Sequence, residues 1–484
     1  MIRSIPIADA HDADMRTAAH EATPQPPLPE AVLRQFDTPG PRYTSYPTAD
    51  RFVEAFGASE VSLAMQQRAA GVAGGQAPLS IYVHIPFCES LCYYCACNKI
   101  ITRHHERAAS YLDALEAELA LVTARLGIGQ EVSQLHFGGG SPTFLSDAEL
   151  SRIVAALERG FRFGREIEMS IEVDPRTVTP ARLTHLRMLG FNRISFGVQD
   201  FDPQVQEAVH RVQPREMVGA LLQSARALGF RSTNVDLIYG LPKQTPGSFA
   251  RTVEQIGALR PDRIALYAYA HLPSRFKPQR RILAEHLPDA GARTAMLRDA
   301  IAGFLSLGYR YIGMDHFALE SDALAVAQRQ GRLHRNFQGY STQPDCDLIG
   351  LGVSSIGRIG PTYYQNAKTL PEYTGAVLEG RLPVVRGHAL TPDDRVRRDV
   401  IMALMCQGRA EYESVEVAHR VDFQRYFASE LRELQVFSQA GLVELEPHGI
   451  RVTPRGWYLV RAVAMVFDRH LRSDRLGERF SRVI

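Results

Sequence analysis

The chain has 484 residues, of which 45% are hydrophobic and 22% are charged, and its formal net charge at pH 7 is +2. This length suits one barrel-sized domain with a smaller second domain, and the near balance of charge argues against nucleic acid as the main partner. No apolar run is long enough for a bilayer and the first residues lack a signal-peptide pattern, so we expect a cytoplasmic protein without a membrane span.

Residues 1–42 are expected to form a flexible arm, because six prolines fall within residues 20–42. From residue 43 to 360, short β-branched runs alternate with stretches of helical period. The expected strands are 79–84, 132–137, 167–173, 193–198, 233–238, 263–269 and 311–314, and the expected helices are 111–126, 147–158, 180–189, 215–228 and 249–259. This alternation predicts a parallel α/β sheet, either open or closed into a full or partial barrel.

Residues 361–484 are expected to form a smaller, mostly helical domain. Helices are predicted at 393–405, 414–418 and 422–440, and two short strands and a helix over 456–471 complete a winged-helix-like pattern. Winged helices often bind DNA, but the charge here is mixed, which favours a structural or substrate-covering role.

Four of the six cysteines lie within residues 88–97, in the pattern Cys-x3-Cys-x2-Cys-x-Cys. Cys346 and Cys406 stand apart without metal-ligand spacing and are expected to be buried thiols. A disulfide scaffold would spread its cysteines, so the crowding indicates a metal site in a reducing compartment.

Cys88, Cys92 and Cys95 can hold three irons of a [4Fe–4S] cluster and leave the fourth iron open. An open iron can bind the amino and carboxylate groups of S-adenosylmethionine. The alternative is a structural zinc site, but zinc usually takes a Cys-x2-Cys pair from each of two segments, and no second pair follows. Cys97 lies only two residues after Cys95, and a fourth thiolate would block the open iron, so Cys97 is expected to act in catalysis rather than as a ligand.

Other unusual residues follow the remaining strands. Gly138–Gly140 follows the second expected strand and Glu172 closes the third, and Gln199, Asp236 and Ala270 lie at the ends of the fourth, fifth and sixth. Since parallel strands end at one edge of a sheet, these residues are predicted to share one site.

The cysteine loop resembles that of the radical S-adenosylmethionine (SAM) superfamily, and residues 138–142 resemble its glycine-rich segment. Further runs at 43–47, 98–100, 236–242, 313–317 and 336–340 are similar to one family, the oxygen-independent coproporphyrinogen III oxidases. The likeness extends over essentially everything after the arm. It implies an α/β fold, a partial (β/α)6-type radical SAM barrel, with the N-terminal arm and the smaller helical domain.

The resemblance also implies an activity. Two propionates of coproporphyrinogen III would be oxidatively decarboxylated to vinyl groups, giving protoporphyrinogen IX, by a 5′-deoxyadenosyl radical made from SAM at the [4Fe–4S] cluster. A low-potential donor such as flavodoxin or ferredoxin, an unidentified electron acceptor and a monomeric state are expected with it.

Residue roles follow from the same resemblance, which implies two SAM molecules. The positions expected around the cluster-bound molecule are Tyr82, Gly139, Glu172 and Ile356, and those around the second are Tyr94, Gly140, Ser141, Gln199, Arg211, Asp236 and Ala270. Each has a plainer interpretation: the glycines could serve a tight turn, Glu172 could be a solvated strand end, and Asp236 a partly buried carboxylate with a local partner. His84 is left out as a strand histidine, and Asp315 and His316 are left undecided.

A second hypothesis is a radical SAM heme carrier or chaperone without decarboxylase activity. Cys97 and the run at 43–47 resemble the enzyme and are expected to be missing from the carriers. A zinc-bound winged-helix regulator is a third hypothesis with little support.

Overall fold

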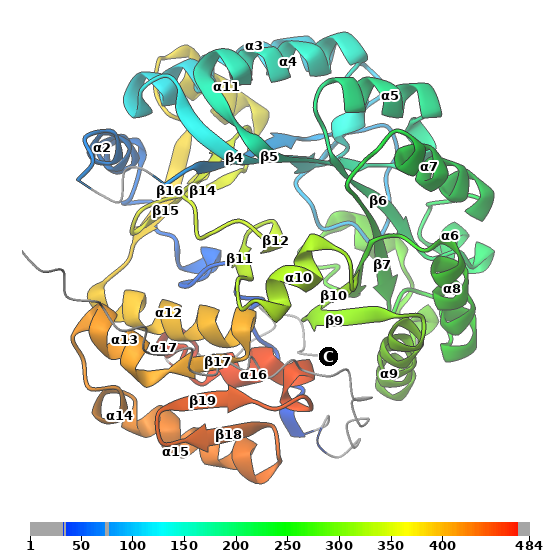
Figure 1. The fold of residues 1–484 in the computed structure, drawn as a ribbon. Helices are drawn as coiled ribbons and strands as arrows, with labels where there is room; N and C mark the ends of the chain where they lie inside the picture. The colour runs from blue at the N-terminus through cyan, green and yellow to red at the C-terminus, as the bar shows by residue number, and fades with distance from the viewer. Residues whose placement is uncertain (1–31, 33–34, 73–76, 473–484) are drawn as a thin grey trace, which may run out of the picture.

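The computed structural model describes residues 32, 35–72 and 77–472, so most of the expected arm lies outside the described residues. The largest feature is a sheet with the strand order β16-β15-β14-β13-β1-β4-β5-β6-β7-β8-β10-β9 (Figure 1). Six neighbouring strands within it are mutually parallel: β1 (Leu79–Ile85), β4 (Gln130–Gly139), β5 (Phe161–Val173), β6 (Arg193–Gln199), β7 (Ser232–Tyr239) and β8 (Arg263–Ala268). They are the six strands expected from the alternation, and the α/β barrel-type fold is confirmed.

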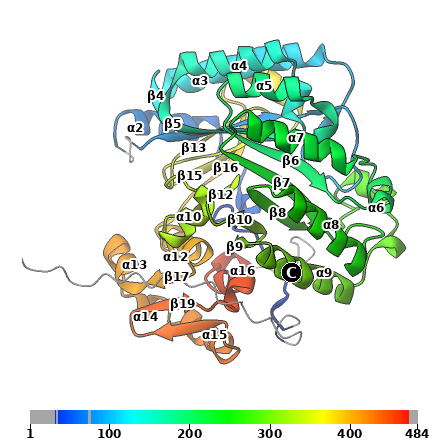
Figure 2. The same ribbon diagram turned by 45° about the vertical axis from the view of Figure 1, so that its right-hand side comes forward.

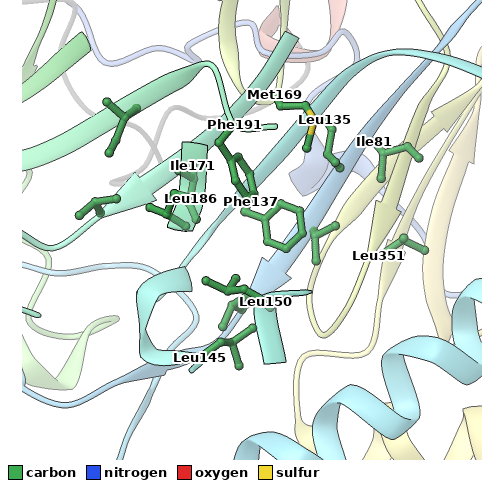
Figure 3. Close-up of a cluster of buried hydrophobic side chains, with 14 of the residues drawn as sticks. Ile81, Leu135, Phe137, Leu145, Leu150, Met169, Ile171, Leu186, Phe191 and Leu351 are labelled. Atoms are coloured by element: carbon green, nitrogen blue, oxygen red, sulfur yellow. The ribbon is translucent and has the colours of Figure 1, made fainter. Parts of the chain in front are cut away.

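Helices cover the outer face of this curved sheet (Figure 2). They are α3 (Arg107–Leu126), α4 (Asp147–Gly160), α5 (Pro180–Met188), α6 (Pro203–Ala208), α7 (Arg215–Ala227) and α8 (Pro246–Leu259). Ser146 begins α4 with a capping box, because its side chain accepts from the Glu149 amide while Glu149 reaches back to the Ser146 amide. Apolar side chains from alternate strand positions fill the space beneath the helices, and there the rings of Phe137 and Phe191 meet edge to face with centroids 5.3 Å apart (Figure 3).

The sheet is wider than the sequence predicts. After β8 come α9 (Ala290–Ser306), β9 (Tyr309–Gly313), which confirms the strand expected at 311–314, and β10 (His316–Leu319), which was not expected and is antiparallel to both β8 and β9. On the opposite edge, β13 (Leu348–Leu351) runs parallel to β1, and β14 (Ile356–Ile359), β15 (Thr362–Asn366) and β16 (Val384–Ala389) extend the sheet antiparallel. The helix α11 (Leu370–Leu378) connects the last two strands.

The change of structure expected at residue 361 therefore falls inside the sheet. Strands of four to six residues carry too little alternation to be recognised by period alone. We propose that the catalytic domain continues to the end of β16, near residue 390.

The remaining chain forms the expected helical region. It contains α12 (Pro392–Gln407), α13 (Tyr412–His419), α14 (Phe423–Tyr426), α15 (Ala428–Gln439), α16 (Val460–Met465) and α17 (Arg469–Arg472), with a small antiparallel sheet of β17 (Arg409–Glu411), β19 (Gly449–Val452) and β18 (Val443–Glu446). The single helix expected over 456–471 is wrong. The carboxylate of Asp468 accepts from the amides of His470 and Leu471, so a new helical segment starts there.

The end of the arm is packed, which differs from the flexible segment expected up to residue 42. The rings of Phe36 and Phe437 lie 4.5 Å apart, and Tyr43 and Tyr46 are fully buried in the core of the C-terminal region. The Tyr43 hydroxyl donates to Asp468 Oδ2 at 2.9 Å. The arm thus joins the C-terminal region to the rest of the fold. No helix among the described residues is long and apolar enough to cross a membrane.

We expect Tyr43→Phe to lower the free energy of unfolding by about 1–3 kcal/mol, because it leaves a buried carboxylate oxygen of Asp468 without its donor. Urea unfolding measures the change. The control is Tyr426→Phe, which removes a similar bond to Asp393 at an exposed position and should change stability by less than about 0.5 kcal/mol. Equal effects of the two substitutions would contradict this account of the arm.

Candidate active site

The cysteine loop leaves the carboxyl end of β1 and is closed at its base. Short strands β2 (Phe87–Cys88) and β3 (Ile100–Ile101) pair in parallel, and the amide of Thr102 donates to the carbonyl of Cys88 at 2.9 Å. Within the loop, the amide of Cys95 donates to the carbonyl of Cys92 at 3.3 Å. The three expected iron ligands are therefore held on one compact loop at the edge where the parallel strands end.

Two guanidinium groups point at the sulfur of Cys92. Arg211 Nη1 lies 3.4 Å and Arg176 Nη2 3.6 Å from Cys92 Sγ, and both side chains also bind Asp174, at 3.2 and 2.6 Å. Burial would raise the pKa of Asp174, but Arg211 and Arg176 outweigh it and keep the pKa low. A thiolate is stabilised by such donors, so the surroundings of Cys92 fit a negatively charged iron–sulfur centre.

All six cysteines are free thiols, and Cys95 and Cys97 interact directly. A hydrogen bond from the Cys97 thiol lowers the pKa of Cys95 to about 6, and the same contact raises the pKa of Cys97. Lys99 Nζ donates to the carbonyl of Cys95 at 2.9 Å. Within the described residues, no three His, Cys, Asp or Glu side chains are grouped closely enough to hold a single metal ion. A cubane differs, because each thiolate binds its own iron.

Three of the four positions expected around the cluster-bound SAM lie together. Glu172 Oε2 accepts from the amide of Gly139 at 3.2 Å, and Glu172 Oε1 lies 3.3 Å from His136 Nε2. The ring of His136 stacks on Tyr82 with centroids 5.8 Å apart. Ile356, the fourth position, begins β14 and faces Gly350, which is the register partner of Tyr82 on β13.

The glycine segment approaches the cysteine loop so closely that side chains cannot fit. Gly139 has a φ of +115°, and a Cβ there would lie 2.6 Å from the His84 ring. A Cβ on Gly140 would lie 2.7 Å from the carbonyl oxygen of Pro86. The same two glycines therefore allow a tight turn and would also let the backbone come close to a ligand.

His84 is a positioning residue that the sequence analysis set aside. Its Nδ1 lies 3.0 Å from the Tyr82 hydroxyl and its Nε2 lies 3.1 Å from the carbonyl of Asn98. The Tyr111 hydroxyl donates to the His84 carbonyl at 2.6 Å. His84 therefore connects β1 to the far end of the cysteine loop. Nothing in the sequence around a lone strand histidine distinguishes this role.

The positions expected around a second SAM line the neighbouring part of the same edge. Gln279, which is buried and was not predicted, donates to the carbonyls of Tyr94 at 3.0 Å and of Ala270 at 3.1 Å, so these two positions are held together. Gln199 and Arg211 meet over Gly197, where a Cβ would lie 2.9 Å from a terminal nitrogen of each. Gly140 and Ser141 follow β4, and their amides donate at 2.8 Å to the carbonyls of Ile85 and Phe87.

Asp236 lies in the middle of β7 rather than at its end. It accepts from Ser195 Oγ at 3.1 Å and from Asn234 Nδ2 at 2.8 Å. Burial, and then the nearby carboxylate of Glu172, raise the pKa of Asp236 to about 7. This carboxyl group is therefore poised to bind hydroxyl donors of a ligand.

A second polar group lies deeper in the barrel and contains Asp315 and His316, which the sequence left undecided. Arg42 Nη1 pairs with Asp315 at 2.8 Å, and its guanidinium lies over the Tyr267 ring at 5.2 Å. Burial lowers the pKa of His316 to about 3, so this imidazole is neutral. The arm thus contributes Arg42 to the interior of the barrel.

Comparisons with known proteins identify the relatives of this chain. A family model described as the Radical SAM superfamily matches residues 82–256, and one described as the HemN C-terminal domain matches residues 390–459, beginning where the sheet ends. The chain is 49% identical over 454 residues to the oxygen-independent coproporphyrinogen III oxidase of Escherichia coli (strain K12), covering 94% of this chain and 98% of that protein. It is 48% identical over 456 residues to the enzyme of the same name from Pseudomonas aeruginosa, with 94% and 98% covered.

A solved structure agrees with these relatives. The structure titled "Coproporphyrinogen III oxidase (HemN) from Escherichia coli is a Radical SAM enzyme" superimposes with a TM-score of 0.87 at 48% identity, covering 92% of this chain and 100% of that one. The similarity therefore extends over both the sheet and the C-terminal helices.

We expect Asp236→Asn to stabilise the apoprotein in a pH-dependent way while weakening SAM binding. Asp236 stays protonated up to about pH 7 in the folded chain but ionises near pH 4 when unfolded. The wild type therefore loses stability as the pH rises from about 4 to 7, and the variant does not. The gap in free energy of unfolding should grow by about 4 kcal/mol over this range and level off above pH 7.

Urea unfolding between pH 5 and 8 measures this gap. Asp299→Asn, at an exposed carboxylate paired with Arg298, is the control and should show no such trend. A constant gap across the pH range would show that Asp236 does not carry a raised pKa.

Proposed function

The chain belongs to the oxygen-independent coproporphyrinogen III oxidases of the radical SAM superfamily, and on this basis we propose that it oxidatively decarboxylates two propionates of coproporphyrinogen III to vinyl groups. The product is protoporphyrinogen IX, an intermediate of heme biosynthesis. The observation that carries the proposal is the three-cysteine loop at the carboxyl edge of the barrel in a chain that is 49% identical to a named enzyme over 94% of its length.

The [4Fe–4S] cluster and SAM, when bound, supply a 5′-deoxyadenosyl radical strong enough to take hydrogen from an unactivated carbon. Cys88, Cys92 and Cys95 hold the cluster in this assignment. Arg176 and Arg211 donate toward Cys92 and balance the negative charge of the thiolates. The protein's own part is to bind and orient the cluster, SAM and the substrate, and to exclude water from them.

Two SAM molecules are part of the proposal. Glu172, set between Gly139 and His136, is suited to accept from the ammonium or hydroxyl groups of the cluster-bound molecule. Tyr82 and Ile356 would pack beside it. The second molecule would lie along Tyr94, Gly140, Ser141, Gln199, Arg211, Asp236 and Ala270, with Asp236 accepting from ribose hydroxyls.

Cys97 is assigned a part in catalysis and none in cluster binding. A fourth thiolate would fill the coordination position that SAM requires, and Cys97 is the one cysteine of the loop that is exposed. The same residue and the run at 43–47 favour the enzyme over the heme-carrier hypothesis, since the carriers are expected to lack both.

The remaining parts of the proposal concern partners. A low-potential protein such as flavodoxin or ferredoxin would reduce the cluster, and an acceptor not yet identified would take the electron left after carbon dioxide departs. We further propose a monomer that works in the cytoplasm.

The test is anaerobic incubation of the reconstituted protein with coproporphyrinogen III, SAM and a reductant, followed by chromatography of the porphyrins after oxidation. Protoporphyrin formed together with 5′-deoxyadenosine is the expected result. Cleavage of SAM with tight porphyrin binding but no decarboxylation would instead support the carrier hypothesis.

Cys97→Ser should keep about four irons per chain and a normal cluster absorption band while losing most decarboxylation. Cys92→Ser should lose the cluster and all activity. Iron and sulfide analysis beside the product assay measures both properties. The role given to Cys97 is wrong if Cys97→Ser loses its iron as Cys92→Ser does, or if it turns over at the wild-type rate.

A further inference from the structure

A row of side chains crosses the inner face of the sheet next to an expected SAM position. Ile356 on β14 is the register partner of Gln365 on β15, and Gln365 is the partner of Arg386 on β16. Directly opposed residues share one face of a sheet, and successive residues of a strand alternate. Tyr364 packs into the core under the helices, so Gln365 and Arg386 face the inside of the barrel.

Gln365 holds Arg386 in place. The glutamine is buried, and its Oε1 accepts from Arg386 Nε at 2.8 Å and Nη2 at 2.6 Å. Its Nε2 donates to the carbonyl of Ser354 at 3.0 Å, in the turn just before Ile356. The guanidinium is thus fixed by a neutral group, and it also lies over the Phe52 ring, 5.8 Å from the ring centroid.

A second cation lies at the same end of the sheet. Lys368 follows β15, and its carbonyl accepts from Asn98 Nδ2 at 2.9 Å, which ties it to the cysteine loop. Within the part of the chain that the structure describes, neither Lys368 nor Arg386 forms an ion pair. Asp50 and Glu54 are the acidic groups that influence Arg386, and both act from outside ion-pair distance.

Arg275, in the connection between β8 and α9, lies near enough to Lys368 and Arg386 to act on both electrostatically. Burial, and then Arg386 and Arg275, lower the pKa of Lys368. Gln279, four residues after Arg275, anchors this connection to the carbonyl of Tyr94 in the cysteine loop. Within the described residues, Asp50 and Glu54 act on Arg386 without an ion pair, so the cations still repel one another, and an anionic ligand would relieve that repulsion.

We propose that Arg386 and Lys368 bind a propionate carboxylate of the tetrapyrrole, one that is held while another reacts. The inference rests on the proposed function and adds a substrate-binding site to it. Two strand spacings, about 10 Å, separate Arg386 from Ile356, so a macrocycle with carboxylates around its rim can reach both places. A guanidinium matches a carboxylate with two parallel hydrogen bonds.

The test uses Arg386→Gln and Lys368→Gln in the reconstituted holoenzyme. Each should raise the KM for coproporphyrinogen III, and the Kd for the stable oxidised probe coproporphyrin III, about 10-fold or more. The kcat at saturating substrate and SAM cleavage without substrate should stay near the wild-type values. Arg386→Lys should recover part of the affinity.

Arg381→Gln is the matched control, because Arg381 lies just before β16 but already pairs with Glu379. It should leave KM and Kd unchanged. Wild-type KM and Kd in both test variants, or an equal loss in the control, would overturn the site. A variant that binds coproporphyrin III normally but is reduced poorly by flavodoxin and well by dithionite would also overturn it, because the cations would then serve a protein donor. If the wild-type enzyme itself formed no protoporphyrinogen, the proposed function would fail instead.

Discussion

The site depends on one constraint, that parallel strands end at the same edge of a sheet. The six strands β1, β4, β5, β6, β7 and β8 run in one direction. This shared direction alone places five features at one edge of the sheet: the cysteine loop, the glycine segment, Glu172, Gln199 and the segment after β8. The register then sets which side chains face inward. Tyr82, Glu172 and Asp236 lie on that inner face because they occupy alternate positions along their strands.

Charge is the second organising feature. In the proposed assignment, three thiolates place negative charge on one loop. Arg211 and Arg176 donate to Cys92, and Lys99 donates to the carbonyl of Cys95 in the same loop. Asp174 holds the two guanidinium groups in place at once. Buried charges are stable only when they are paired and hydrogen-bonded. Asp174, Arg176 and Arg211 meet this condition, because they pair with one another beside the cysteine loop. Among the described residues Arg386 forms no ion pair and is held by the neutral Gln365, which sets it apart from these arginines.

The sequence predicts the six parallel strands well, because each carries a strong apolar run followed by a helical period. It also places Glu172 and Gln199 near the ends of their strands, but Asp236 lies in the middle of β7. It does not predict β13, β14, β15 and β16, whose four to six residues give too short a pattern, and so the expected boundary at residue 361 falls inside the sheet. Residues 43–47 were matched to the family, but no local pattern shows that Tyr43 is buried against Asp468, 425 positions along the chain.

The supporting residues of the site were missed for a related reason. Gln279 and His84 act through hydrogen bonds to backbone carbonyls of distant segments, and such carbonyls leave no trace in the identity of the residues that carry them. Cys88, Cys92 and Cys95 can be proposed as cluster ligands from the sequence because metal ligation demands a particular residue type at a particular spacing. Side chains that ligate a metal can be predicted from the sequence, whereas side chains that hydrogen-bond to the backbone of a distant segment cannot.

The central claim is that three thiolates leave one iron open to SAM at this edge of the barrel. Electron-nuclear double resonance of the reduced cluster, with SAM carrying ¹⁵N in its amino group, tests it most directly. The account predicts a hyperfine coupling to that nitrogen, which disappears when SAM is omitted and persists in Cys97→Ser. A fully assembled and reduced cluster that shows no coupling to the labelled nitrogen in the presence of SAM would contradict it.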